Sequence, residues 1–588
     1  MKRNIGESII ISDLSTAVPK SAITSRPKKG CWYSMDYELV DGTRGVMLTA
    51  DPVFQAVEIR IPLNVVGIYK VYIGVNYFKK CYQANPYGSL WVKLSGDRGF
   101  SRIGLESYFR AGLEENPQGK YREKVLERAD EVWLGEVGDG KNGYNTIYEV
   151  YWRTEDLTGK SIVVSTPKPP YSGEYYGDLT NISFIRLESA TDEELKLIKK
   201  LERQHGSRNM AAIWCAGALS GHTAGQRMYH PESRQWFEDE FQAYRGSDFG
   251  IFCMEAIRGN LCLFPTKRGD VGTLDGSWKN SWVDPLAEFA RLVRKEGMRM
   301  FVGVRMIGGG RPYAFNPINW SRFFWNHREW VKISREGNLC SNLSLAYAGV
   351  REYWLELLRE VLDYGIDGIL LYFNRGQPFV LYEEPSVSSF MQKHDVDPRE
   401  LPADDERWQT HVAGYVTRFV REVRSLLDEK PGRELAVIFR GIPVFRPGMI
   451  IDGCDPDTWI EKGLIDYIFC NLHIFDRGID YHGAPEYIRY WKKMGEGRVQ
   501  VYSNLMPRQQ PGEEYAETAE VLYNLGADGF CVWDSERRIQ RASEWNVLKY
   551  LGHRQLLGYF KQKAPDYYRF NRIKLMRGLD VRYSYTDG

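Results

Sequence analysis

The sequence predicts an α/β protein, a (β/α)8 TIM barrel preceded by an antiparallel β-sandwich domain. From about residue 208 onward, apolar segments of strand length alternate with amphipathic segments of helix length. Before residue 190, short segments alternate apolar and polar residues and show no helical period. The stretch 346–375 combines an amphipathic helix, a stop at Gly365 and an apolar strand that ends in Asn374 and Arg375. Such a helix–strand unit is the repeat of a barrel whose polar strand ends carry the chemistry.

Size and composition narrow the class of protein. A chain of 588 residues is too long for one core, so two or three domains are expected. The 78 Lys and Arg nearly balance the 77 Asp and Glu, which argues against general binding to nucleic acid or to anionic membranes. The 17 Trp, 37 Tyr and 26 Phe suit a carbohydrate protein, because sugar C–H faces pack on flat rings. Aromatic residues also fill β-rich cores, so this reading has a structural alternative.

The cysteines and the N-terminus bear on location. The nine Cys are scattered and form no Cys-x-x-Cys motif, which favours buried free thiols in a reducing compartment. The first residues lack the apolar core of a signal peptide, and no apolar run reaches transmembrane length. We therefore expect a soluble cytoplasmic protein without a membrane partner, although a chain with a trimmed leader would look the same.

The first third of the chain divides into an arm, a sandwich and a linker. Residues 1–29 form a polar N-terminal arm, and residues 30–190 form the β-sandwich, which either binds carbohydrate or serves as a packing domain. Residues 191–207 form a linker helix, with Thr191 as N-cap and acidic residues in the first turn. The predicted sandwich strands are 45–49, 56–62, 68–75, 90–94, 147–152, 161–165 and 181–187.

Residues 208–556 are assigned to the catalytic barrel. A doubly wound open sheet is the alternative, but no Gly-x-Gly-x-x-Gly follows a strand and no Walker loop is present. Residues 557–588 have a β texture and either add a strand to the sandwich or cover the outside of the barrel. The predicted barrel strands are 211–215, 250–255, 300–305, 368–374, 434–440, 467–473, 499–504 and 529–534. The predicted helices are 231–245, 284–297, 346–364, 405–429, 456–463, 485–495, 513–525 and 543–556.

Three stretches resemble the family-10-like glycosyl hydrolases, barrels that often follow a β module. They are Val350-Arg-Glu-Tyr-Trp through Asp367-Gly-Ile, Asp455-Pro-Asp-Thr-Trp through Asp466-Tyr-Ile, and Gly526-Ala-Asp-Gly-Phe. Their order and spacing over roughly residues 300–535 carry the resemblance. It implies a barrel that hydrolyses O-glycosidic bonds of an oligo- or polysaccharide.

The sequence departs from that family pattern on the fourth strand. Tyr372 stands where such proteins commonly have an acidic residue, so the catalytic acids are expected on other strands. Two rival classes follow from the strand ends. Tyr372 is compatible with a barrel that binds glycans without cleaving them, and an Arg-rich mouth is compatible with a lyase or isomerase acting on a sugar acid. Fold resemblance alone does not choose between them.

Glycoside hydrolysis usually needs two carboxyl groups, one protonated and one ionised. Glu255 follows an apolar run, so burial is expected to suit it to the role of general acid. Asp534 follows the last strand, next to Trp533 as a possible stacking face. The structural alternatives are an ion pair of Glu255 with Arg258 and, for Asp534, a cap on the following turn or an ion pair with Arg537. Glu383 and Glu384, in a loop after the fourth strand, are held in reserve.

Other strand-end residues are of types that bind sugars. Asn and Arg side chains are good partners for hydroxyl and carboxylate groups, and the Arg residues hint at an anionic sugar. Pairing of these Arg residues with structural acids is the alternative. The predicted substrate-binding residues are Trp214, Arg305, Tyr372, Asn374, Arg375, Arg440, Asn471, His473, Asn504 and Trp533.

No cofactor or metal is expected. The chain has no His-x-x-x-His and no dense Asp/Cys cluster, and it lacks the Gly-x-Ser-x-Gly motif of a serine nucleophile. The predicted partner is therefore a carbohydrate substrate, with a homo-oligomer as a possibility.

Overall fold

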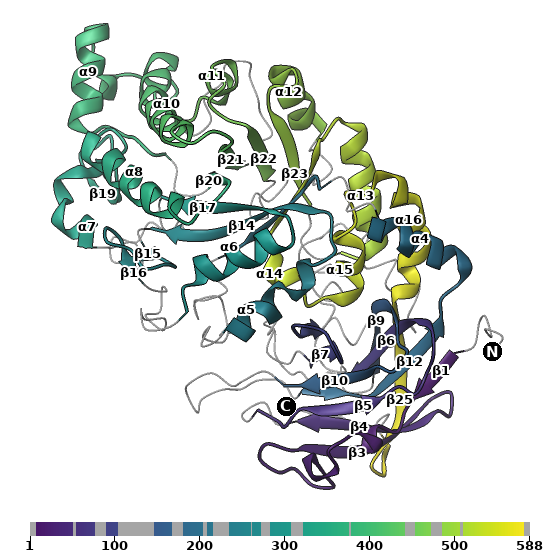
Figure 1. Ribbon diagram of the computed structural model, residues 1–588. Coiled ribbons are helices and arrows are strands. Elements are labelled where there is room, and N and C mark those ends of the chain that lie inside the picture. Colours follow the sequence, from purple (N-terminus) through teal and green to yellow (C-terminus); the bar gives the residue numbers. More distant parts are fainter. Residues whose placement is uncertain are drawn as a thin grey trace.

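The structure is a computed structural model with two parts. In Figure 1 a barrel with its helices occupies the upper part, and a set of antiparallel strands lies below it. Statements about what the structure contains or lacks refer to its described residues. These are 8–50, 55–76, 90–103, 146–166, 180–203, 208–215, 234–259, 261–271, 283–306, 322–374, 378–440, 453–471, 485–505 and 510–580.

Eight parallel strands form a closed barrel, which confirms the predicted fold class. Their order is β13-β24-β23-β22-β21-β20-β17-β14, and β13 also pairs with β14 and closes the ring. Each predicted strand is present. The barrel strands are β13 (Met210–Trp214), β14 (Phe249–Arg258), β17 (Arg299–Arg305), β20 (Gly368–Phe373), β21 (Glu434–Arg440), β22 (Tyr467–Asn471), β23 (Gln500–Asn504) and β24 (Gly529–Trp533).

The barrel strands are apolar on both faces because each face is buried. On β14, Ile251 and Cys253 belong to the interior cluster, whereas Phe252 and Met254 pack against the helices. This pattern is typical of parallel strands enclosed by helices, and it fills the interior with side chains. Because apolar side chains fill the interior, inward-facing polar side chains are expected only at the ends of the strands.

The helices surround the barrel close to the predicted positions. In the predicted helix 231–245, the α-helix ends at Phe241 and continues as a 3-10 turn at 242–244, and residues 231–233 lie outside the described residues. The predicted helix 543–556 ends at Leu548. Of the described helices, none is both long and apolar enough to cross a bilayer. The main helices are α5 (Arg234–Phe241), α6 (Pro285–Lys295), α8 (Ala348–Leu362), α10 (Glu406–Asp428), α11 (Pro456–Glu461), α12 (Pro485–Gly495), α13 (Gly512–Asn524) and α15 (Ala542–Leu548).

The barrel carries additional helices and strands that the sequence patterns did not predict. They lie mainly between β17 and α10, where a hairpin and two helices form the upper left of Figure 1. Two further short elements follow β24 and precede the last long strand. The additional elements are β15 (Leu261–Cys262), β16 (Asp270–Val271), α7 (Arg322–Asn326), β18 (Val331–Ile333), β19 (Leu339–Leu343), α9 (Glu384–His394), α14 (Ser535–Arg538) and α16 (Leu557–Lys563).

The sandwich consists of two antiparallel sheets. The larger has the order β1-β12-β6-β9-β25-β3-β4-β11, with β2 and β26 at its side, and the smaller has the order β5-β10-β7-β8. Their strands are β1 (Ser8–Ile11), β2 (Ile23–Thr24), β3 (Trp32–Leu39), β4 (Arg44–Ala50), β5 (Ile59–Pro62), β6 (Ile68–Asn76), β7 (Leu90–Leu94), β8 (Ser101–Ile103), β9 (Thr146–Asp156), β10 (Ser161–Ser165), β11 (Thr180–Ile182), β12 (Phe184–Ser189), β25 (Tyr568–Met576) and β26 (Leu579–Asp580).

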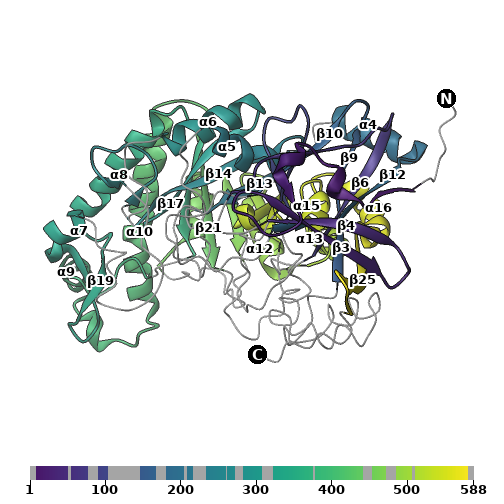
Figure 2. The ribbon, with the colours of Figure 1, turned by 90° about the horizontal axis from the view of Figure 1, so that it is seen from below.

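The end of the chain returns to the sandwich. Strand β25 pairs with β9 on one side and β3 on the other, so it lies in the middle of the larger sheet. In Figures 1 and 2 this yellow strand lies among purple ones. The segment predicted to be β over 557–588 begins with helix α16 (Leu557–Lys563), and only its part from Tyr568 onward adds a strand to the sandwich. Residues 581–588 lie outside the described residues. Helix α4 (Asp192–Arg203), predicted as the linker, leads from β12 back to the barrel.

Closure of the barrel depends on two glycines beside the start of β13. A Cβ on Gly250 of β14 would overlap the carbonyl oxygen of Arg208, and a Cβ on Gly529 of β24 would overlap that of Asn209. The Asn209 carbonyl also accepts a hydrogen bond from the amide of Phe530 at 3.1 Å. Because these are backbone contacts, a side chain at either position would push β13 away from its neighbours.

We predict that Gly529→Ala lowers the free energy of unfolding by about 1–3 kcal/mol, the usual cost of overpacking a buried position. The matched control is Gly414→Ala in α10, where a Cβ meets nothing within 4 Å. That exposed helical change should be neutral or stabilising by up to about 1 kcal/mol. Urea unfolding of the variants and the wild type measures both effects. Equal stability of the two variants would show that the contact at Asn209 does not constrain closure.

Candidate active site

The carboxyl ends of the barrel strands bring several predicted residues to one mouth. Glu255 of β14 and Arg305 of β17 share the inward parity of Cys253 and Phe301, which belong to the interior cluster. Trp214 of β13 is in register with Met254, so the next residue, Cys215, lies level with Glu255. On the other side of β13, Ile213 is in register with Trp533. The end of β13 therefore lies between Glu255 and Asp534.

Glu255 is fully buried and lies in an ion pair. Its Oε1 is 2.8 Å from Nε of Arg305, and Nη2 of Arg305 donates to Oε2 at 3.4 Å. The thiol of Cys215 donates to Oε2 at 3.0 Å. The side chain of Arg258, the predicted structural partner, lies at the longer distance of 4.0 Å from Oε1. The carboxylate of Glu255 thus contacts both a guanidinium and a thiol donor, and charge-assisted contacts of this kind are among the stronger ones in proteins.

Arg305 lies above an aromatic floor. Its guanidinium carbon is 5.6 Å from the ring centre of Tyr372 and 5.7 Å from that of Trp533, within the range of cation–π attraction. The two rings are 5.1 Å apart. Tyr372 covers Gly303, where any Cβ would overlap the phenol. Burial, followed by nearby acidic groups, raises the pKa of Tyr372 far above its usual value, so the phenol stays neutral. The floor is thus a neutral surface that supports one fixed cation.

Asp534 occupies the turn that follows β24. Its backbone is left-handed, with φ of 52°, a conformation that Asp tolerates better than most residues. The turn is fixed by the buried Arg538, which donates to the carbonyl of Trp533 at 3.2 Å and to that of Leu505 at 3.0 Å. Asp534 itself is 5% exposed, so its carboxylate lies inside the mouth rather than on the outer surface.

Cys215, Asp534 and Glu536 form a compact buried cluster. The sulfur and one oxygen of each carboxylate lie within 4.8 Å of one another. Since the same sulfur is 3.0 Å from Glu255, the carboxylates of Glu255 and Asp534 are at most 7.8 Å apart, the sum of those two distances. Two acids from opposite sides of β13 are therefore within reach of one small substrate group.

The cluster has the residue types of a metal site but lacks a thiolate. Burial, and after it the charges of Glu255, Asp534 and Glu536, raises the pKa of Cys215 well above its usual value. The thiol donates to Glu255, and Glu536 accepts the amide hydrogen of Cys215 at 3.1 Å. Because a metal needs the deprotonated sulfur, the arrangement fits a hydrogen-bonding thiol better than a ligand set.

Two asparagines behave differently. Asn504 at the end of β23 accepts the amide hydrogen of Trp533 at 3.3 Å, so it holds the strand that carries the aromatic floor. Asn374 follows β20 and is 2% exposed, yet neither atom of its carboxamide has a hydrogen-bond partner among the described residues. A buried polar group is normally satisfied. Asn374 is therefore a group at this mouth with hydrogen-bonding capacity left for a ligand.

Three of the predicted site residues do not lie with Glu255 and Asp534 at the barrel mouth. The indole of Trp214 points to the helix layer, where it donates to Glu240 at 3.0 Å and packs against Phe289. The buried carboxylate of Glu383 accepts the amide hydrogens of Ile333 and Leu381 and so holds the β18–β19 hairpin. Glu384 is exposed at the start of α9. Their roles are structural in each contact that the structure shows.

The remaining predicted residues fall partly outside the described part of the chain. Arg375 and His473 lie outside it. Arg440 and Asn471 end β21 and β22 and are paired in register there, and only their backbones are described.

Sequence reasoning missed Cys215 and Glu536 as members of the site. The sequence pattern predicts only a buried thiol for Cys215. Its alternation with the inward-facing Ala211 and Ile213 is the signal that places it in the barrel mouth. Glu536 gives a weaker signal, because it lies in a turn after the strand and only the fold turns it toward Cys215.

Comparisons with known proteins give only loose overlaps. No known family profile matches the sequence, and a search of curated proteins gives no match. The spore cortex-lytic enzyme SleL of Bacillus megaterium QM B1551 is 10% identical, with a TM-score of 0.32 over 60% of this chain and 73% of that one. The α-galactosidase TtGalA of Thermus thermophilus is 13% identical, with a TM-score of 0.33 over 89% and 95%.

We predict that Arg305→Met destabilises the protein by about 3–5 kcal/mol, because the change leaves the Glu255 carboxylate buried without its partner. The double variant Arg305→Met, Glu255→Gln should recover much of that loss, since no unpaired charge then remains. Denaturant unfolding of the wild type, both single variants and the double variant gives the coupling free energy. Additive losses would mean that the two side chains do not form a coupled pair.

Proposed function

We propose that the protein is a glycoside hydrolase that cleaves O-glycosidic bonds by carboxylate catalysis at the mouth formed by β13, β14 and β24. The observation that carries the proposal is the placement of Glu255 and Asp534, at most 7.8 Å apart around the buried sulfur of Cys215. Retaining glycosidases place their carboxyl groups about 5–5.5 Å apart and inverting ones about 6.5–9.5 Å apart. The observed limit accommodates either stereochemistry.

The surroundings of the two acids assign different roles to them. Glu255, ion-paired with Arg305, is proposed as the ionised group, which either attacks the anomeric carbon or activates a water molecule. Asp534 lies within 4.8 Å of a second carboxylate, Glu536. Two carboxylates this close favour sharing a proton, so this pair is proposed to protonate the leaving oxygen. The assignment reverses the expectation that Glu255 is the general acid.

Substrate binding is proposed to use Asn374 first. Its unpartnered carboxamide can donate to one sugar hydroxyl and accept from another. Tyr372 and Trp533 lie beneath Arg305, and their burial makes them the floor of the site rather than an open stacking platform. The resemblance to family-10-like glycosyl hydrolases supports an oligo- or polysaccharide as substrate.

The structure weakens the arguments for a non-catalytic glycan-binding barrel and for a sugar-acid lyase or isomerase. A binding protein without catalysis was suggested by Tyr372 in an acidic position, but Glu255 supplies a carboxylate from a neighbouring strand. A sugar-acid lyase or isomerase was suggested by an Arg-rich mouth, yet Arg305 is already paired with Glu255 at 2.8 Å. Hydrolysis therefore accounts for more of the described contacts than either alternative.

We predict that the wild type adds water to at least one member of a panel of neutral and acidic oligosaccharides, as read by mass spectrometry. Glu255→Gln and Asp534→Asn should each lower kcat by about 10²–10⁴-fold, the range expected for loss of acid–base catalysis. Glu384→Gln is the matched control, because this exposed carboxylate lies on α9 and should leave the rate unchanged. A glycan that binds with no change in mass would contradict the proposal.

A second measurement separates lost chemistry from lost folding, because Glu255→Gln also leaves Arg305 without its anion. In Glu255→Ala, added formate or azide should enter the vacated space, pair with Arg305 and restore part of the turnover. Circular dichroism and thermal unfolding monitor the fold of each variant. A folded Glu255→Ala with wild-type turnover and no response to either anion would exclude Glu255 from the reaction.

A further inference from the structure

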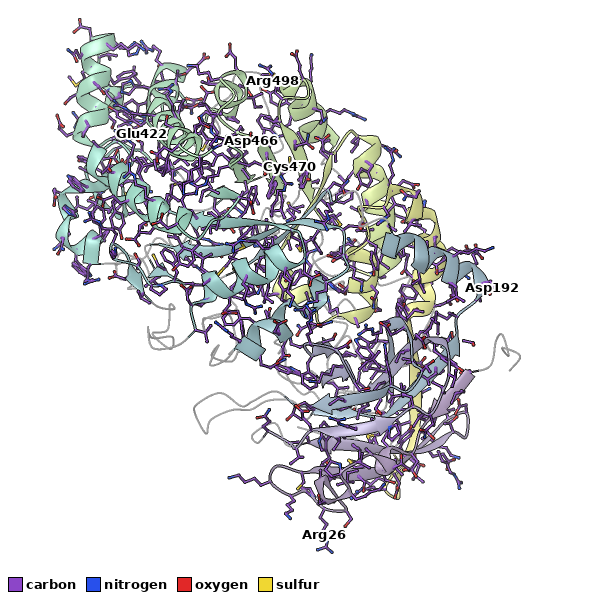
Figure 3. The ribbon with its side chains drawn as sticks, in the orientation of Figure 1. Arg26, Asp192, Glu422, Asp466, Cys470 and Arg498 are labelled. Atoms are coloured by element: carbon purple, nitrogen blue, oxygen red, sulfur yellow. The ribbon has the colours of Figure 1, made fainter. Side chains whose placement is uncertain are left out.

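A second cavity lies between the sandwich and the barrel. Its volume is about 420 Å³, within the usual range for small-molecule sites. It is walled by β6 and β9 of the sandwich and by α4, α15 and α16. Figure 1 shows these helices between the barrel and the purple sheet, and Figure 3 marks the start of α4 at Asp192. The walls come from distant parts of the sequence, so the cavity exists only in the assembled chain.

This cavity is separate from the mouth of the barrel. Asp248, which lines it, immediately precedes β14, whereas Glu255 lies near the opposite end of that strand. At ~3.3 Å per residue, the two residues are roughly 23 Å apart along the strand. The end of the cavity at Asp248 therefore lies far from Glu255. Arg102, in another part of the wall, donates to the backbone carbonyl of Glu536 at 3.4 Å.

Aromatic rings form much of the cavity wall. Tyr151 stacks on Tyr567 with ring centres 4.4 Å apart and lies 5.6 Å from Tyr72. On the other side, Tyr550 and Phe560 are nearly parallel at 6.5 Å. Burial raises the pKa values of Tyr72, Tyr151 and Tyr567, so these phenols stay neutral. The wall is therefore rich in uncharged aromatic groups, although Tyr151 and Tyr567 stack on each other and Arg186 lies over one face of Tyr72.

Most cations that line the cavity already have carboxylate partners. Lys70 is 2.9 Å from Glu194, and Arg102 is 2.7 Å from Glu240. Arg153 contacts Asp97 at 2.8 Å.

Arg245 and two acids of the wall also have partners of opposite charge, whereas Asp566 is exposed. Arg245 pairs with Glu238. Of the acids, Glu155 pairs with Arg153 at 2.5 Å, and Asp248 contacts His553 at 2.7 Å. Asp566 is exposed. These groups largely neutralise one another.

Two lysines of the wall differ from those pairs. Lys549 and Lys563 have no carboxylate partner among the described residues. The ammonium of Lys549 lies 4.9 Å from the ring centre of Tyr550. Burial, and after it the charge of Arg153, lowers the pKa of Lys549 to about 7. The cavity thus holds a cationic group that lacks the anion it would need to stay charged.

We propose that this cavity binds a small organic carboxylate, with its ring against the aromatic wall and its carboxylate against Lys549. The charge that the wall leaves unbalanced is positive, and the unbalanced group lies beside flat neutral rings. A carboxylate attached to an aromatic or sugar ring satisfies both features at once. This site is independent of the hydrolysis proposed at the barrel mouth.

Binding should take up a proton at alkaline pH. Free Lys549, with its pKa lowered by burial, is mostly neutral at pH 8, whereas a bound carboxylate favours its ammonium form. The affinity is therefore expected to fall about tenfold per pH unit above pH 7 and to level off below it. The titration of a ligand carboxyl group, far more acidic, cannot produce this profile.

Isothermal titration calorimetry of the full-length protein with benzoate and D-glucuronate tests the proposal. At least one of the two anions should bind saturably at pH 6.5, and the neutral counterparts benzyl alcohol and D-glucose should bind at least tenfold more weakly. At pH 8, titrations in phosphate and in Tris should differ in heat by the uptake of nearly one proton. Binding by neither anion, or equal binding of anions and neutral counterparts, would overturn the proposal.

Variants locate the binding. Lys549→Met keeps the length of the side chain and should weaken anion binding at least tenfold at pH 6.5 while abolishing proton uptake at pH 8. Lys561→Met is the matched control on α16, because Lys561 pairs with Glu520 and does not line the cavity. Glu255→Gln should bind as the wild type does, which excludes the barrel mouth. If Lys549→Met remains folded by thermal unfolding and binds the anions normally, the proposed site is wrong.

Discussion

The architecture depends on the pairing of β13 with both β14 and β24. This closure joins segments more than 250 positions apart in the sequence, and it sets Cys215 level with Glu255 and one residue beyond the level of Asp534. The contact is tight because Gly250 and Gly529 leave room for the backbone that leads into β13. A side chain on either glycine would separate the strands and with them the two carboxylates. The geometry of the proposed active site is thus a consequence of backbone packing at the other end of the same strands.

Closure also forces charges into an apolar interior, and the ion pair of Glu255 and Arg305 shows how they are accommodated. Desolvation opposes the Arg305 charge, but Glu255 and the other acidic groups outweigh it and raise its pKa. The aromatic floor adds cation–π attraction without adding a charge. Such a pair is costly to form and costly to break. Its presence at a strand end, where an apolar pair would pack as well, is more easily explained by chemistry than by stability.

Much of the fold and part of the site could be predicted from the sequence. The eight strands are predictable because parallel strands enclosed by helices are apolar on both faces. The positions of Glu255 and Arg305 at predicted strand ends indicated that they lie near the barrel mouth. The strand-end position of Trp214 alone suggested a substrate contact, but Trp214 alternates with the inward Ile213, and its indole donates to Glu240 in the helix layer. The partner of Glu255 could not be predicted either, since Arg258 is closer in sequence and Arg305 is closer in space. Such choices depend on register between strands, which a single sequence does not encode.

The sandwich and the barrel are physically one unit despite their different textures. After Asp534 the chain forms α15 and α16 and then enters the sandwich as β25. Ala542 and Tyr568 belong to the sandwich core, and Asn546 of α15 donates to the carbonyl of Trp152 at 2.6 Å. Removing either part would therefore expose apolar surface and leave buried polar groups unsatisfied in the other. The segment that follows a proposed catalytic residue is the same one that walls the interdomain cavity, so the cavity depends on the packing of both parts against each other.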